Sequence, residues 1–233
     1  YLYERLDPLR RAYLHGEVAS ALESMGAVAS GAPDWTDTVD NLSDEYDDLL
    51  GLPEGLVSEA QMAWHCELAG LAQEAALHHL RAGRRSAFFS LDLATQHRHW
   101  RKALDLLSSL PQSLERAHLE QLLYSCLGTT TAHIKGQIAP EAGEAYRKSL
   151  ELAERIGDPL LIADGLTVVA IHHRHLGELD PAVSLGERAV RLSRGGPRMW
   201  ALFVEGHLAL SHLHRGDFAA SAGLLEPVSS AAL

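Results

Sequence analysis

A repeat of 39 to 40 residues constrains the fold of this chain more than any other feature. Four segments from residue 99 onward align at intervals of 39, 40 and 39 positions on Ala103, Ala142, Ala182 and Ser221. Seven residues further on, two helical turns away on the same face, stand Leu110, Ser149, Ala189 and Val228. A turn glycine precedes each of the last three segments: Gly136, Gly177 and Gly216. This period predicts helix-turn-helix units, each of which buries its apolar stripe only against its neighbours.

The segments between glycines and prolines have a helical pattern throughout. Apolar residues recur at spacings of three and four and not of two, and no segment reads as a strand. In the first helix Asp7 is the expected cap and Pro8 suits the first turn. The apolar stripe predicted for it, before Gly26, is Leu14, Val18, Ala21, Leu22 and Met25. Further helices are predicted at about 43–50, 58–69, 72–82, 85–97 and 100–109, ending near Gly51, Gly70, Gly83 and Pro111.

The net charge of −11 comes from one stretch of the sequence. Residues 12–80 hold thirteen Asp or Glu and no Lys or Arg, which makes sequence-independent binding of nucleic acid an unfavoured function. Seven of these acids lie within fifteen residues, namely Asp34, Asp37, Asp40, Asp44, Glu45, Asp47 and Asp48. A calcium loop needs alternating ligands, whereas the spacing here is three and four. We interpret the segment as a solvated acidic loop and short helix, with docking on a basic surface of another domain as the alternative.

Targeting and redox signals are sparse. The only cysteines are Cys66 and Cys126, which supply neither a disulfide framework nor a multi-cysteine zinc site. No apolar run approaches the roughly 20 residues that cross a bilayer, and residues 1–25 lack the order of a signal peptide. The sequence therefore predicts a cytoplasmic chain without a membrane contact.

The repeats resemble lengthened tetratricopeptide repeats. In HLGELDPAVSLGERAVRL, residues 175–192, the residues Gly177, Ala182 and Ala189 fall at the glycine and alanine spacing of that family. Other units depart from it, because Ser221 and Val228 replace alanines and the tryptophan and tyrosine positions are not filled. The resemblance implies an all-α fold, a right-handed α-solenoid of helix-turn-helix repeats.

Two N-terminal segments resemble a more specific family. YERLDPLRRAYLHGEVASALE, residues 3–23, and EAQMAWHCELAGLAQEAALHHLRAG, residues 59–83, are similar to the region that follows the ATPase and winged-helix modules in large bacterial signal-transduction ATPases. These include maltose-regulon-activator-like and antibiotic-regulatory-protein-like transcription factors and some adenylyl cyclases. We expect a helical segment over 1–98 with an acidic insertion at about 26–58, continuous with repeats over 99–233, the whole being a fragment of a larger protein.

Catalytic motifs are absent from the sequence. No GxxxxGK[ST], GxGxxG, HExxH, GxSxG or CxxC occurs, so we assign no catalytic residue, cofactor or metal. Histidine is the unusual feature at 14 residues, and we interpret most of them as amphipathic residues on partly exposed helix faces. A pH-sensitive groove and a metal site are the alternatives.

A ligand-facing stripe follows from the resemblance, in which the first helix of each pair lines a concave surface. Counting back thirteen, nine, six and three residues from each turn glycine selects Leu123, Leu127, Thr130 and His133, then Asp164, Val168, Ile171 and Arg174, then Phe203, His207, Leu210 and Leu213. His175 and His214 join this interaction groove because each precedes a turn glycine by two residues. The aliphatic members have an alternative role in packing between helices, so the polar Arg174, Asp164, His133 and His207 are the preferred candidates.

Three functions remain open at the level of the sequence. The first is a non-catalytic sensor or interaction domain of a bacterial regulatory ATPase, most simply a transcriptional regulator, whose groove binds a small-molecule effector, a protein partner or other domains of the same parent chain. The second is a structural scaffold for homo-oligomers, or the sensor region of a cyclase-type protein. The third is a metal-dependent enzyme that uses the histidines.

Overall fold

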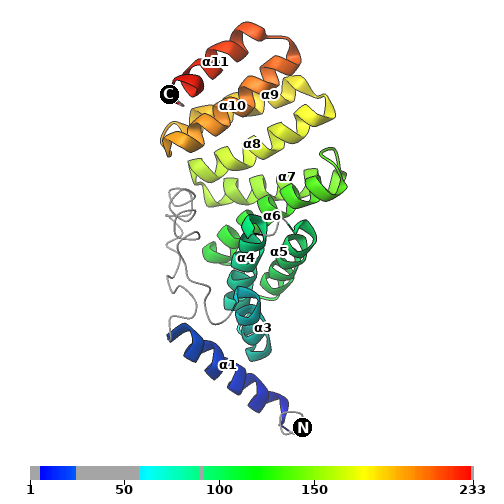
Figure 1. The fold of residues 1–233 in the computed structure, drawn as a ribbon, viewed down its shortest axis with the longest axis vertical. Coiled ribbons are helices and arrows are strands. Elements are labelled where there is room, and N and C mark those ends of the chain that lie inside the picture. Colours follow the sequence, from blue (N-terminus) through cyan, green and yellow to red (C-terminus); the bar gives the residue numbers. More distant parts are fainter. Residues whose placement is uncertain (1–5, 25–57, 90–91, 232–233) are drawn as a thin grey trace. The chain divides into compact units, whose positions relative to one another are not determined.

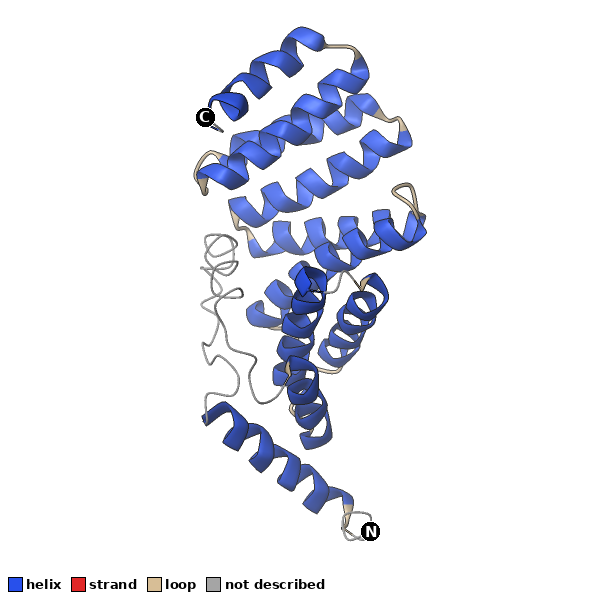
Figure 2. Ribbon diagram, viewed as in Figure 1, coloured by secondary structure: helices blue, strands red, loops and turns tan. Residues whose placement is uncertain are grey.

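The described part of the chain is entirely helical. The computed structural model describes residues 6–24, 58–89 and 92–231, and within them it contains ten helices and no strand (Figure 2). The chain divides into two compact units, Tyr1–Leu123 and Tyr124–Leu233. None of the described helices is long and apolar enough to span a membrane.

Helices that follow one another in the sequence pack together within each unit (Figure 1). The N-terminal unit holds α1 (Pro8–Ser24), α3 (Glu59–Ala69), α4 (Ala72–Phe89) and α5 (Leu93–Ser108). Helix α6 (Leu114–Lys135) crosses the division between the units. The C-terminal unit continues with α7 (Pro140–Ile156), α8 (Pro159–Leu176), α9 (Leu179–Ser193), α10 (Arg198–Arg215) and α11 (Phe218–Ala231). Helix α8 contacts α10 as well as α9, so residues on alternate helices of this unit come together.

The predicted turn glycines end three helices. Gly136, Gly177 and Gly216 have φ values of 105°, 81° and 91°, a left-handed conformation that glycine adopts without the clash of a Cβ atom. The amide of Gly177 donates to carbonyl oxygens in the last turn of α8, and that of Gly216 does so in α10. The sequence was right about these ends because the backbone geometry demands this residue type.

The repeated small positions lie in the helix interfaces, as the sequence predicted. Ala103, Ala142 and Ala182 are fully buried, and Ser221 is 4% exposed. At the second position of the repeat, Ser149 and Ala189 are also fully buried. Small side chains let neighbouring helix backbones approach closely, and larger apolar residues such as Leu166, Val204 and Leu208 fill the core beside them.

Two expectations for the N-terminal unit are wrong. Helix α4 does not end at Gly83 but runs to Phe89, and one helix at 93–108 replaces those expected at 85–97 and 100–109. Gly83 is required by packing, because a Cβ atom there would lie 2.6 Å from the Trp100 ring. A glycine inside a helix thus looks like a stop signal when its packing partner is unknown. The helix expected at 43–50 lies outside the described residues.

The buried face of α1 also differs from the predicted stripe. Asp7 caps the helix, since its Oδ1 accepts from the amide of Arg10 at 3.0 Å. Leu22 of that stripe does pack against the core, and Met25 lies outside the described residues. Leu14 and Val18, however, are 42% and 40% exposed, whereas His15 and Ala19 are buried. The helix is rotated so that the small Ala19 faces α3, where it packs against Met62 and Cys66.

Candidate functional site

The residues of the predicted interaction groove differ widely in exposure. The exposed members are His133, His175, Phe203, Leu210, Leu213 and His214. The half-buried members are Leu127, Asp164, Val168, Ile171 and His207, and the buried members are Leu123, Thr130 and Arg174. The groove as a whole stays a prediction, and the exposures decide which members present surface to a ligand.

The part of the groove assigned to α6 offers little surface. Leu123 is fully buried, and Thr130 is 4% exposed and donates its hydroxyl to the carbonyl oxygens of Cys126 and Leu127 in its own helix. The prediction that Leu123 and Thr130 face a ligand is therefore corrected. Their buried side chains are used in packing and in hydrogen bonds within the helix. His133 is exposed, with Nδ1 2.7 Å from the carbonyl oxygen of Thr129.

The Asp164 carboxylate also has a hydrogen-bond partner within the protein. The Ser125 hydroxyl donates to its Oδ2 at 3.3 Å, which links α8 to α6 within the C-terminal unit. The side chain is half-buried, so the structure places it beside another helix rather than on an open surface.

Helices α8 and α10 bring four of the predicted residues together. Arg174, in the last turn of α8, donates from Nη1 to the main-chain oxygen of His207 on α10 at 3.2 Å. His175 is close enough to both side chains to interact with them electrostatically, and His214 is close enough to His175. These basic groups form one cluster, which we call the α8–α10 basic cluster: Arg174, His175, His207 and His214.

An exposed apolar row borders this cluster on α10. Phe203 is 51% exposed, Leu210 38% and Leu213 42%. The Phe203 ring meets the His207 ring edge to face, with centroids 4.5 Å apart. Their spacing along the chain places the row on one face of the helix. An apolar row with adjacent polar groups is a surface that suits a ligand with an apolar body.

Burial and like charge lower the pKa values of two histidines of the cluster, His175 and His207. The pKa of His207 falls from 6.5 to about 4, first because burial penalises its charged form and then because Arg174 and His175 repel a further positive charge. Burial, followed by Arg174, also lowers the pKa of His175. Near neutral pH His207 is therefore an uncharged ring, and Arg174 carries the fixed charge.

Two atoms of the cluster have no hydrogen-bond partner among the residues that the structure describes. Arg174 is 7% exposed, and its Nε is buried without a partner. The Nδ1 atom of His207 is buried without a partner as well. A buried polar atom left without a hydrogen bond costs free energy, so such atoms in a native protein call for a physical explanation.

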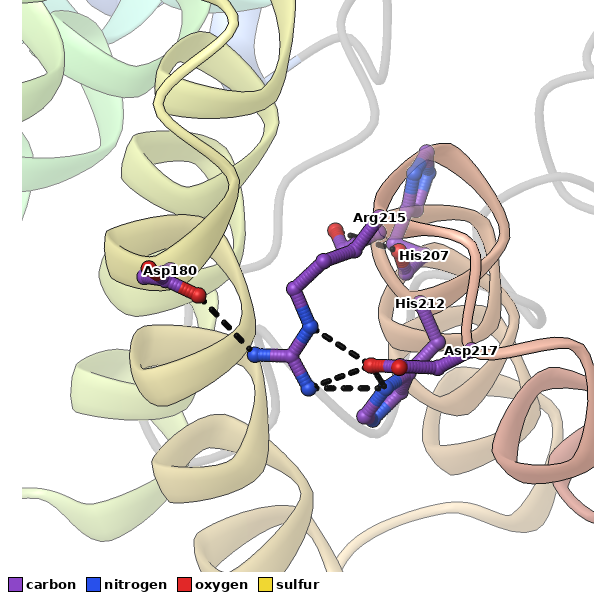
Figure 3. Close-up of polar contacts among 6 residues, drawn as sticks. Asp180, His207, His212, Arg215 and Asp217 are labelled. Carbon is purple, nitrogen blue, oxygen red and sulfur yellow. Dashed lines mark hydrogen bonds and ion pairs between the residues drawn. The ribbon is translucent and has the colours of Figure 1, made fainter.

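The last turn of α10 shows the opposite arrangement (Figure 3). Arg215 donates to Asp217 through Nε at 2.5 Å and lies 3.3 Å from Asp180 of α9 through Nη1. His212 Nδ1 lies 3.3 Å from the same Asp217 carboxylate. The charges of this turn are matched locally, so it is suited to holding α9 and α10 together.

The sequence did not predict a second surface feature, a pocket between α7 and α8. It has a volume of about 220 Å³ and is lined by Pro140, Gly143, Tyr146, Arg147, Val169, His172, His173 and Leu176. Its only sequence signal is Gly143, where a Cβ atom would lie 2.4 Å from Nε2 of His172. The His172 ring is held by the main-chain oxygen of Gln137, 3.0 Å from Nδ1.

Two pairs of histidines lie in the N-terminal unit. In the N-terminal unit, His79 contacts His99 at 2.8 Å and the Glu67 carboxylate at 2.7 Å. His15 contacts His65 at 2.9 Å. No group of three or more metal-binding side chains converges within the described residues.

Comparison with known proteins supports the fold alone. No protein-family model and no curated protein sequence matches the chain. The crystal structure of BtubC (BKLC) from P. vanneervenii is similar, with a TM-score of 0.58 over 97% of this chain and 91% of that chain. The two sequences are 12% identical, so the similarity places this protein among all-helical structures and carries no statement about activity.

Proposed function

We propose that this chain is a non-catalytic sensor domain of a bacterial regulatory ATPase, most simply a transcriptional regulator, built as an α-solenoid of tetratricopeptide-like repeats. Its groove on α8 and α10 binds an effector or a partner. The repeat of 39 to 40 residues, with Ala142, Ala182 and Ser221 buried in the interfaces, supports the solenoid. The regulatory role follows from the sequence resemblance.

One observation carries the binding role. Phe203, Leu210 and Leu213 leave a row of large apolar side chains open on α10, next to the α8–α10 basic cluster. Apolar contact area supplies affinity, while a few polar groups orient the ligand. A bound effector changes the activity of a parent ATPase only if it binds the off and on states unequally.

A thermal-shift screen against a metabolite panel, with nucleotides and sugars included, tests this role. A ligand at a hundred times its dissociation constant adds about 2.7 kcal/mol, which is a shift of several degrees for a domain of this size. The double variant Phe203→Ser, Leu213→Ser is expected to lose the shift. Leu225→Ser is the matched control, because Leu225 is 40% exposed on α11 and Leu213 is 42% exposed on α10.

An equal shift in the wild type and in the double variant would contradict binding at this row. No shift from any compound would exclude a small-molecule effector from the panel and favour a protein partner. Concentration-dependent self-association of the chain without ligand, measured by sedimentation, would favour the oligomerisation scaffold instead.

A further inference from the structure

Arg174 has no acidic partner among the described residues, whereas several other cations of the protein are paired with carboxylates. Arg215 has Asp180 and Asp217, Arg188 has Glu154, and Lys135 has Glu141. Each of these cations is partly exposed, where water already solvates the charge. Arg174 is 7% exposed, and its single hydrogen bond goes to a neutral main-chain oxygen.

This arrangement is costly to the folded protein. Burial alone accounts for the lowered pKa of Arg174, with no opposing contribution from a carboxylate. The charge of a guanidinium nevertheless persists at all ordinary pH values. Charges that remain buried in proteins are usually paired, because the loss of hydration is otherwise uncompensated. The neighbouring histidines do not offset this cost, since Arg174 lowers the pKa values of both His175 and His207 and neither ring supplies a negative charge.

The two atoms without hydrogen bonds indicate which kind of ligand group would satisfy them. Arg174 Nε–H is a donor, and the neutral His207 ring donates from Nδ1 when its proton resides there. A guanidinium matches the geometry of carboxylate and phosphate oxygens, and hydrogen bonds to charged groups are stronger than neutral ones. His175 and His214 are exposed beside these donors, so imidazole rings that can donate hydrogen bonds line the approach from solvent.

We propose that the α8–α10 basic cluster is an oxyanion site, in which Arg174 and His207 bind a carboxylate or phosphate group of the ligand. This inference rests on the proposed function and specifies its ligand: an acidic group sits at Arg174, and the apolar body of the same molecule lies along Phe203, Leu210 and Leu213. The acidic group completes the charge balance that the described residues leave open.

The test is anion-dependent stability of the 233-residue chain near pH 7. Inorganic phosphate and succinate are each titrated at constant ionic strength by exchange against sodium chloride, and unfolding is followed by circular dichroism. Saturable stabilisation of the wild type is expected with at least one of them. Arg174→Met is expected to raise the apparent dissociation constant at least tenfold, equal to about 1.4 kcal/mol. Stabilisation by phosphate alone identifies a phosphorylated ligand, and stabilisation by succinate alone identifies a carboxylate.

Arg215→Met is the matched control, since it removes the same side chain from a turn that already has two carboxylates. It is expected to leave the anion effect unchanged. Absence of any saturable effect in the wild type, or an equal effect in Arg174→Met, would overturn the oxyanion site. If a compound of the metabolite panel still stabilises the wild type and loses its effect in Phe203→Ser, Leu213→Ser, the proposed function stands without it.

Discussion

The last turns of α8 and α10 have the same framework and opposite charge balance. In each turn a histidine four residues before the glycine contacts the acid directly after it. His173 Nδ1 lies 2.5 Å from Glu178, and His212 Nδ1 lies 3.3 Å from Asp217. The framework therefore belongs to the helix-turn-helix unit itself and does not distinguish the two sites.

The arginines make the difference. Arg215 lies between two carboxylates, whereas Arg174 is buried beside histidines and has no carboxylate partner among the described residues. A cation that is paired with carboxylates, such as Arg215, is accounted for by the helix contact that it stabilises. An unbalanced buried cation points to a ligand, because its desolvation has no counterpart within the described part of the protein.

The largest expected effect comes from removing the buried charge. Arg174→Met keeps an apolar side chain of similar reach, and replacing buried charges by apolar groups is often neutral or stabilising. Without anions we expect the free energy of unfolding to rise by about 1 kcal/mol. Urea denaturation measures it. Arg215→Met should instead lower the midpoint slightly, since it breaks existing ion pairs. A clear loss of stability in Arg174→Met would mean that the arginine is structural.

Acid should affect the α8–α10 basic cluster and the last turn of α10 at different pH values. The folded pKa of His207 lies at about 4, below its ordinary 6.5, so the unfolded chain binds the proton first as the pH falls. Its stabilising contribution is therefore present above 6.5 and is lost between 6.5 and about 4. His207→Gln should flatten this part of the pH profile of the urea midpoint. Other histidines with lowered pKa values are present in both proteins and cancel in the difference, apart from His175, which interacts with His207.

Asp217 provides the contrast at lower pH. Its hydrogen bonds with Arg215 and then His212 hold its pKa below 3.8, so the carboxylate stabilises the fold above that value. The loss occurs as the pH falls from 3.8 through the lowered pKa. Asp217→Asn should therefore follow the wild-type slope between pH 6.5 and 4. A flattened slope there would contradict the assignment of that window to His207.

The smallest effect is expected for the histidine–carboxylate contact that both turns share. His173→Ala and His212→Ala each remove one histidine–carboxylate contact, and partly exposed ion pairs of this kind contribute less than about 1 kcal/mol. The loss should be larger for His212, whose side chain is 10% exposed against 29% for His173. Thermal unfolding of the two variants measures this order. A reversed order would show that the turns differ in more than their arginines.

The sequence predicted turns and close helix contacts better than it predicted what surrounds each residue. The turn glycines and the small residues Ala142 and Ala182 were found, because a left-handed turn and a close helix contact each restrict the residue type. Gly83 was misread, since the Trp100 ring that excludes a side chain there lies on another helix.

The groove shows the same limit. The tetratricopeptide resemblance placed Arg174 and His207 in one predicted groove, yet it also included Leu123 and Thr130, whose buried side chains serve packing and helix hydrogen bonds. A helical period identifies a face but not what covers it. Whether Arg174 has a counter-ion depends on all the side chains around it, so its lack of one among the described residues can be seen only in the folded structure.

The most direct test of the account observes the guanidinium of Arg174 itself. Two-dimensional ¹⁵N NMR of the arginine Nε–H groups, assigned with Arg174→Met and Arg215→Met, is followed during titration with phosphate and with succinate. The account predicts that the Arg174 signal shifts and saturates with one of these anions, while the Arg215 signal stays in place. An Arg174 signal that does not move, or that moves only in proportion to the Arg215 signal, would contradict an oxyanion site at the end of α8.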